Sequence, residues 1–104
     1  MIRGRMMRLA IILAVLMLVG AEAQADAIRQ ACLGSERGTG QRGLCTCIQS
    51  VADQTLTARD QKRAARFFKD PDIAQETRRS DRPRDEDFWD RYERFGDYAQ
   101  KICR

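Results

Sequence analysis

The sequence has 104 residues, of which 33% are charged, with four cysteines, no histidine and a formal net charge of +4. The lack of histidine removes the side chain that most often serves as a general base and as a metal ligand. Residues 26–104 hold 16 basic and 14 acidic residues, a net charge of +2, which argues against a nucleic-acid-binding or polybasic membrane-binding protein.

Residues 1–25 have the organisation of a secretory signal peptide. Three arginines precede the apolar run "LAIILAVLMLVG" (9–20), which small residues in A-x-A spacing follow. We expect cleavage after Ala23 or Ala25, which leaves a periplasmic or secreted chain. The apolar run is shorter than the roughly 20 residues of a membrane span, so we expect no stable span after cleavage. The alternative is an uncleaved N-terminal anchor.

Residues 26–104 predict an all-α domain, because no stretch alternates apolar and polar residues as a strand does. The sequence predicts helices over 26–33, 44–54, 58–68 and 71–79, and a long last helix from Phe88 to Ile102. We expect a small bundle of four to five short helices, held together by two disulfides, in a single domain.

Turn and capping residues separate these helices. The loop at 34–43 contains the spacing G-x-G-x-x-G, but no strand precedes it, so a nucleotide site is not expected. Thr57 and Asp60 have the spacing of a capping box, and Asp70 with Pro71 predicts the start of the next helix. The segment "SDRPRDED" (80–87) is interpreted as a charged linker.

The last helix carries an apolar stripe at helical spacing. The stripe consists of Phe88, Tyr92, Phe95, Ala99 and Ile102. Trp89 lies off this stripe and is therefore a candidate contact residue. The acidic residues near the start of the helix are Asp81, Asp85, Glu86, Asp87 and Asp90. They lack the spacing of an EF-hand loop, so helix capping explains them better than calcium binding, and no metal site is expected.

Four cysteines in an exported chain of this size predict two disulfides. Cys45 and Cys47 are one residue apart, so on a helix they point some 160° apart and face different neighbours. Their partners are then Cys32 and Cys103, and we favour Cys32–Cys45 with Cys47–Cys103, because Cys32 ends one helix and Cys45 begins the next. The opposite pairing stays open. A redox-active C-x-C dithiol is the alternative function of this pair, whereas zinc would favour C-x-x-C spacings.

Basic residues gather on one side of the helix predicted over 58–68. They are Arg59, Lys62, Arg63 and Arg66. Such a face could bind an anionic head group or an acidic partner. The alternative is an ordinary solvated face, since Asp60, Asp70 and Asp72 lie close by in the sequence.

The segments "LCTCIQSVADQTLTARDQKRAARFFKDP", "RRSD" and "FWDRYERFGDYAQKIC" resemble a group of small secreted four-cysteine proteins of Gram-negative bacteria. Members of this group often carry the label "arginine transporter". After signal cleavage such a chain could only accompany a transporter or bind a solute. The resemblance implies no catalytic residues.

These features favour an exported soluble periplasmic binding module with no cofactor, whose partner is a periplasmic protein or a small solute. No catalytic group stands out, so we do not expect an enzyme. The alternative is a thiol–disulfide redox protein that uses Cys45 and Cys47. Arginine binding would need two carboxylates around a guanidinium. Only Asp85, Glu86, Asp87 and Asp90 supply them densely.

Overall fold

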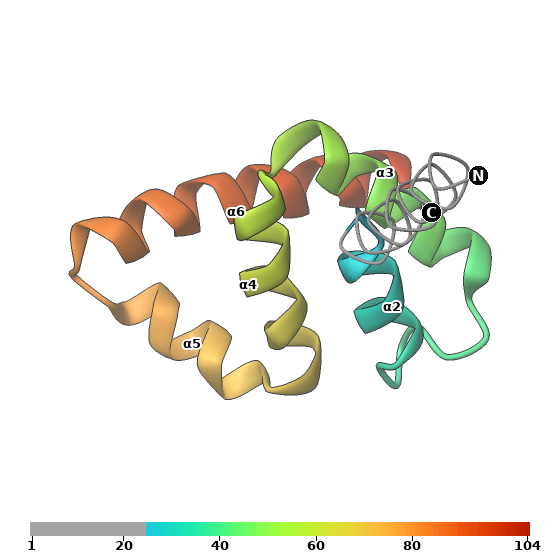
Figure 1. Cartoon of the computed structure of the whole chain (residues 1–104), viewed down its shortest axis with the longest axis horizontal. Helices are drawn as coiled ribbons and strands as arrows, with labels where there is room; N and C mark the ends of the chain where they lie inside the picture. The colour runs from blue at the N-terminus through green and yellow to red at the C-terminus, as the bar shows by residue number, and fades with distance from the viewer. Residues whose placement is uncertain (1–24) are drawn as a thin grey trace, which may run out of the picture.

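The computed structural model describes residues 25–104, which form five helices and no strand (Figure 1). The helices are α2 (Ala27–Leu33), α3 (Arg42–Thr55), α4 (Ala58–Lys69), α5 (Pro71–Arg79) and α6 (Pro83–Ile102). Two disulfides join them, so the prediction of a small all-α bundle with two disulfides is confirmed. The predicted signal peptide lies outside the described residues, apart from Ala25.

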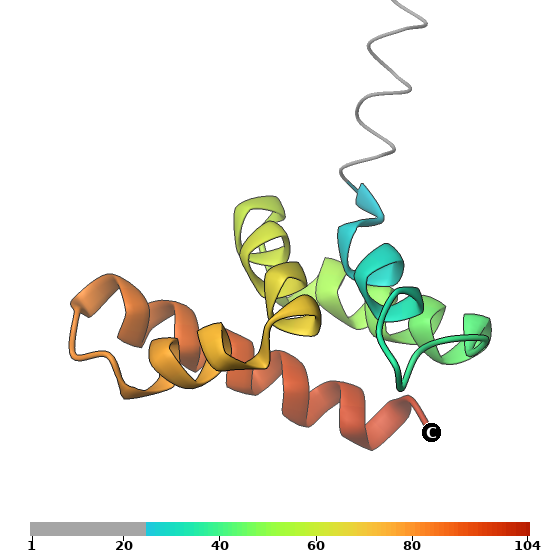
Figure 2. The same cartoon turned by 90° about the horizontal axis from the view of Figure 1, so that it is seen from below.

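Helix α4 lies in the middle of the structure (Figure 1). Helices α2 and α3 lie on one side of it, together with the C-terminal part of α6. Helix α5 and the N-terminal part of α6 lie on the other side. Figure 2 shows α6 running along the length of the bundle, and the Cys47–Cys103 disulfide holds its end against α3, so α6 connects both sides.

The caps of α4 and α5 follow the sequence. The Thr57 side chain accepts a hydrogen bond from the backbone N–H of Asp60, and Asp70 accepts one from the N–H of Asp72. Asp60 does not complete the expected capping box, because its carboxylate binds Arg91 of α6 instead. An interaction across the bundle has replaced a local one.

The linker predicted over 80–87 is wrong beyond residue 82, because α6 begins at Pro83. Proline at the first helical position has its backbone angle preset for a helix and lacks only an N–H that would have no partner there. Asp85 and Glu86 then occupy the first turn, where the helix dipole favours carboxylates. The same acids that suggested a linker therefore start the helix.

Helix α3 is buried over a wide arc. Its buried residues are Cys45, Gln49, Val51 and Ala52, whereas Leu44, Ile48 and Thr55 are only half-buried. The reason is that α3 packs against α2 on one flank and against α6 on the other.

Aromatic residues of α4 and α6 form the largest part of the core. The Phe67 ring forms T-shaped contacts with the rings of Phe88 and Tyr92, with ring centroids 5.8 and 5.1 Å apart. Phe88 and Phe95 are buried and Tyr92 is half-buried, as the predicted stripe requires. Ile102 is 52% exposed, which contradicts the stripe at its last position. Cys103, the next residue, is the side chain that bonds α3, and Ile102 is turned outward.

A buried amide network joins the first three helices. The Gln49 side-chain oxygen accepts a 2.8 Å hydrogen bond from the backbone N–H of Arg29, in the first turn of α2. The Gln49 amide nitrogen donates to Asp53 and to Gln61 of α4. A side chain from α3 therefore caps α2, whose own N-cap, Asp26, makes no side-chain cap hydrogen bond.

Among residues 25–104, no helix combines the length and the apolar character needed to cross a membrane.

Candidate functional site

The four cysteines form Cys32–Cys45 and Cys47–Cys103, which is the pairing favoured because Cys32 ends one helix and Cys45 begins the next. The first disulfide joins α2 to α3 and is buried, with Cys32 3% and Cys45 0% exposed. The second joins α3 to the end of α6, and both its cysteines are half-buried. The two members of the C-x-C pair thus bond to different helices and not to each other.

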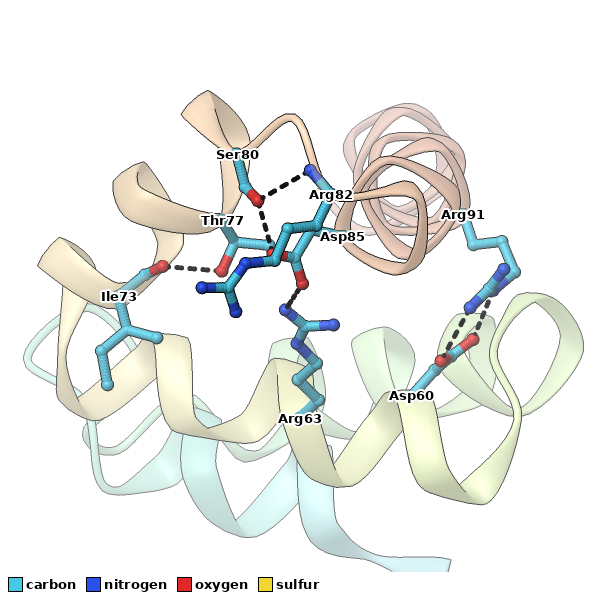
Figure 3. A network of polar contacts seen from close by, with 8 residues as sticks. All are labelled: Asp60, Arg63, Ile73, Thr77, Ser80, Arg82, Asp85 and Arg91. Carbon is cyan, nitrogen blue, oxygen red and sulfur yellow. Dashed lines mark hydrogen bonds and ion pairs between the residues drawn. The ribbon is translucent and has the colours of Figure 1, made fainter.

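Two ion pairs hold α4 against α6 (Figure 3). Arg91 donates two hydrogen bonds to the carboxylate of Asp60, at 2.6 and 3.1 Å. Arg63 donates to Asp85, whose other oxygen accepts a 2.6 Å hydrogen bond from the Ser80 hydroxyl. The Ser80 hydrogen bond and the Arg63 guanidinium hold the pKa of the Asp85 carboxyl below its ordinary value.

Arg63 is therefore a structural residue rather than part of a free basic face. Its guanidinium carbon also lies 4.4 Å from the centre of the Phe88 ring, where a cation is attracted to the ring electrons. Asp60 likewise cannot neutralise the basic face, because its side chain is buried and paired with Arg91.

The remaining basic side chains of α4 form one continuous strip, which we call the cationic ridge. The ridge consists of Arg59, Lys62, Arg66 and Lys69. Their helical positions fall within an arc of about 80°. All four side chains are exposed, and none forms an ion pair with another residue of the described chain.

An open groove lies beside the cationic ridge, between α2 and α4. One part has a volume of about 520 Å³, and its lining residues are Ala27, Gln30, Ala31, Gly34, Ala65, Arg66 and Lys69. The adjoining part has about 760 Å³, and its lining residues are Gly34, Ser35, Glu36, Arg37, Phe68, Lys69 and Pro71. The two parts share Gly34 and Lys69, so we treat them as one surface, the α2–α4 groove.

The lining of the α2–α4 groove combines apolar and basic side chains. Alanines from α2 and α4, with Phe68, supply the apolar surface. Arg66, Lys69 and Arg37 supply the positive charge, against a single carboxylate from Glu36.

The structure separates the contact residues predicted from the sequence. Arg66 lies in the groove and Arg59 on the ridge, whereas Arg63 is taken up by Asp85. Trp89 packs half-buried against Phe67 and Tyr92, and its indole N–H donates to Glu93 at 2.8 Å.

Sequence reasoning missed two basic residues of this site, Lys69 and Arg37. Lys69 follows Arg66 by three residues, so the helical spacing could have found it had the helix been extended by one residue. Arg37 lies in the loop after α2, and no periodic pattern predicts its position near Lys69.

Within residues 25–104, the acidic run forms no candidate metal site. Asp85 is already engaged by Arg63 and Ser80, and within residues 25–104 no group of three or more His, Cys, Asp or Glu side chains could hold a metal ion.

Comparison with protein-family models gives no match, and comparisons with curated proteins and with solved structures give none either.

Proposed function

We propose that this protein is an exported helical binding module that binds anionic groups of a partner at the α2–α4 groove and the cationic ridge. The observation that carries the proposal is a set of four exposed cations on one face of α4, beside the α2–α4 groove, that form no ion pair within residues 25–104.

This arrangement opposes folding unless an anion neutralises it. Arg59, Lys62, Arg66 and Lys69 are neighbours at spacings of three and four residues along one helix. Like charges at such spacings destabilise a helix by roughly 0.2–0.5 kcal/mol per pair. Acidic residues interspersed at these positions would relieve that repulsion. Binding of an anionic partner would relieve it as well, and would also bury the groove.

Export is the second part of the proposal. Two disulfides fit an oxidising compartment outside the cytoplasm, and the signal peptide expected over residues 1–25 would deliver the chain there. A periplasmic location remains part of the proposal.

A role as an accessory to arginine transport finds less support in the geometry. The cationic ridge repels a guanidinium, and Asp85 is already paired with Arg63. We expect no shift in melting temperature with arginine at millimolar concentration, and a clear stabilisation would restore this role.

The proposed function is tested by an amide NMR titration with hexaglutamate as the probe. We expect shifts confined to α4 and to residues 27–37, and their loss in the double variant Arg66→Glu/Lys69→Glu. Arg94→Glu, an exposed reversal on α6, is the matched control and should bind like the parent. Absence of shifts at the groove, or equal shifts with hexalysine, would contradict the proposal.

The redox alternative has one observation in its favour, which is the half-buried position of Cys47–Cys103. A redox-active bond should open in a glutathione buffer, whereas structural disulfides typically have potentials below about −300 mV. If both bonds persist in that buffer, as we expect, the redox alternative is excluded.

A further inference from the structure

We infer that the partner presents an acidic amphipathic helix, which lies along the α2–α4 groove with its carboxylates against the cationic ridge. This inference rests on the proposed function and names the class of its ligand.

The small residues of the groove favour a helix as the occupant. Ala27, Ala31 and Gly34 follow one another at spacings of four and three residues on α2, and Ala65 faces them from α4. Helices pack with their axes 8–10 Å apart, and the distance depends on the side chains at the contact. Alanine and glycine permit the closest approach, so the apolar side chains of an incoming helix can enter the groove.

The position of the cationic ridge indicates where the partner helix should carry its carboxylates. The cationic ridge runs from Arg59 to Lys69, which is about 15 Å along α4. Carboxylates repeated every three or four residues along roughly three turns of a partner helix match this length. Arg37 and Lys69 contribute positive charge to the second part of the groove.

The same geometry is less suited to an anionic lipid. An acyl chain needs an enclosed apolar channel to leave water, whereas the α2–α4 groove is open to solvent. A helix needs to bury only one face, and its other face can remain in water.

The test uses three synthetic peptides of about 18 residues, a length that supports partial helix formation. The first has a Leu/Ala stripe flanked by glutamates, the second has glutamine for each glutamate, and the third is a scramble of the first with equal charge. We expect the first to bind about tenfold or more tightly than either of the others in a fluorescence anisotropy titration. Its affinity should fall between about 50 and 300 mM salt, because screening weakens exposed ion pairs.

A blocked groove provides the matched variant. Gly34 is exposed and in helical geometry, and a Cβ there would lie 3.5 Å from its nearest neighbour, the Gln30 carbonyl oxygen, so Gly34→Tyr fits without backbone strain. Gly43→Tyr on α3 is the control, since nothing lies within 4 Å of its Cβ position. Gly34→Tyr should reduce peptide affinity about tenfold, whereas Gly43→Tyr should leave it unchanged.

The outcomes separate the inference from the function on which it rests. Equal binding of the scramble and the amphipathic peptide, or no effect of Gly34→Tyr, overturns the helix while hexaglutamate shifts still support anion binding. Tighter binding to phosphatidylglycerol vesicles than to the first peptide assigns the surface to lipid and also overturns it. Absence of hexaglutamate shifts in the parent protein contradicts both the helix inference and the proposed function.

Discussion

The two sides of the bundle are held together by different chemistry. The disulfide end comprises α2, α3 and the last turn of α6, which two disulfides cross-link. The ion-pair end comprises α5 and the first half of α6, which contain no cysteine. Here the helices are held to α4 by the aromatic contact between Phe88 and Phe67. The Arg63–Asp85–Ser80 cluster adds polar contacts (Figure 3).

This difference indicates which side of the bundle can unfold locally while the α2–α4 groove stays intact. Thr77 is the one buried residue of α5, and Ile73 is 37% exposed. Local opening tends to occur where few apolar groups are buried, so α5 should be the least protected helix. The α2–α4 groove draws most of its lining from the disulfide end and α4 and should survive such opening.

The largest expected effect comes from removal of the long disulfide with Cys47→Ser/Cys103→Ser. The bond spans 56 residues, and the chain-entropy model then predicts a loss of about 4 kcal/mol in the free energy of unfolding. Denaturant titration of the parent and the variant measures it. Hydrogen exchange should show the loss of protection spreading from the last turn of α6.

The matched control is Cys32→Ser/Cys45→Ser, whose bond spans 13 residues and should contribute about 3 kcal/mol. The single variant Cys103→Ser should free a thiol at Cys47 and leave Cys32–Cys45 intact. If Cys103→Ser melts like the parent, the disulfide end does not depend on its cross-links and the comparison fails.

A smaller effect is expected from Gly38→Ala in the loop that follows α2. Gly38 is buried, and a Cβ there would lie 1.7 Å from the carbonyl oxygen of Cys32. The loop must therefore move away from α2, at a cost of about 1–3 kcal/mol typical of overpacking. Thermal melts measure this cost. Gly43→Ala, where the Cβ position is open, should melt like the parent or slightly higher.

The next effect tests the ion pair between the middle helix and α6. Arg91→Ala leaves the carboxylate of Asp60, whose side chain is 8% exposed, without its partner. We expect a loss of about 1–2 kcal/mol, in the lower part of the range for an unpaired buried group, because the Arg91 side chain is 38% exposed. Denaturant titration measures it. Asp60→Asn/Arg91→Ala should recover part of the loss, and an unchanged Arg91→Ala would show that the pair contributes nothing.

Local signals explain the part of the fold that the sequence predicted. Helical periodicity located the five helices, and Thr57 and Asp70 marked two of their starts, because capping depends on residues two or three positions apart. The spacing of Cys45 and Cys47 on α3 also predicted that the two side chains point in different directions and bond to different partners.

Contacts between distant residues explain the rest. Gln49 caps a helix that ends 16 residues before it, and Asp60 binds Arg91, which follows it by 31 residues. No periodicity carries such pairings. The basic face on α4 was visible in the sequence, but only the structure removes Arg63 and Asp60 from it and adds the groove. An interpretation that balanced Arg59 and Arg66 against nearby aspartates therefore loses Asp60, which is paired with Arg91.

The smallest expected effect concerns pH and the ion-pair end. Hydrogen bonding from Ser80 and the charge of Arg63 lower the pKa of Asp85 below its ordinary value near 3.8. Because the folded state favours the carboxylate, this stabilisation is present above the ordinary pKa of 3.8 and is lost as the pH falls through the lowered pKa. Protection of the α5 amides in hydrogen exchange should therefore decrease below about pH 4 while the disulfide end stays protected.

In Asp85→Asn, α5 should be less protected at neutral pH, and this acid-dependent decrease should be smaller. Ser80→Ala should raise the pKa of Asp85 toward its ordinary value in an NMR titration of the carboxyl carbon. If the parent and Asp85→Asn lose α5 protection in parallel below pH 4, another carboxyl controls this end of the bundle.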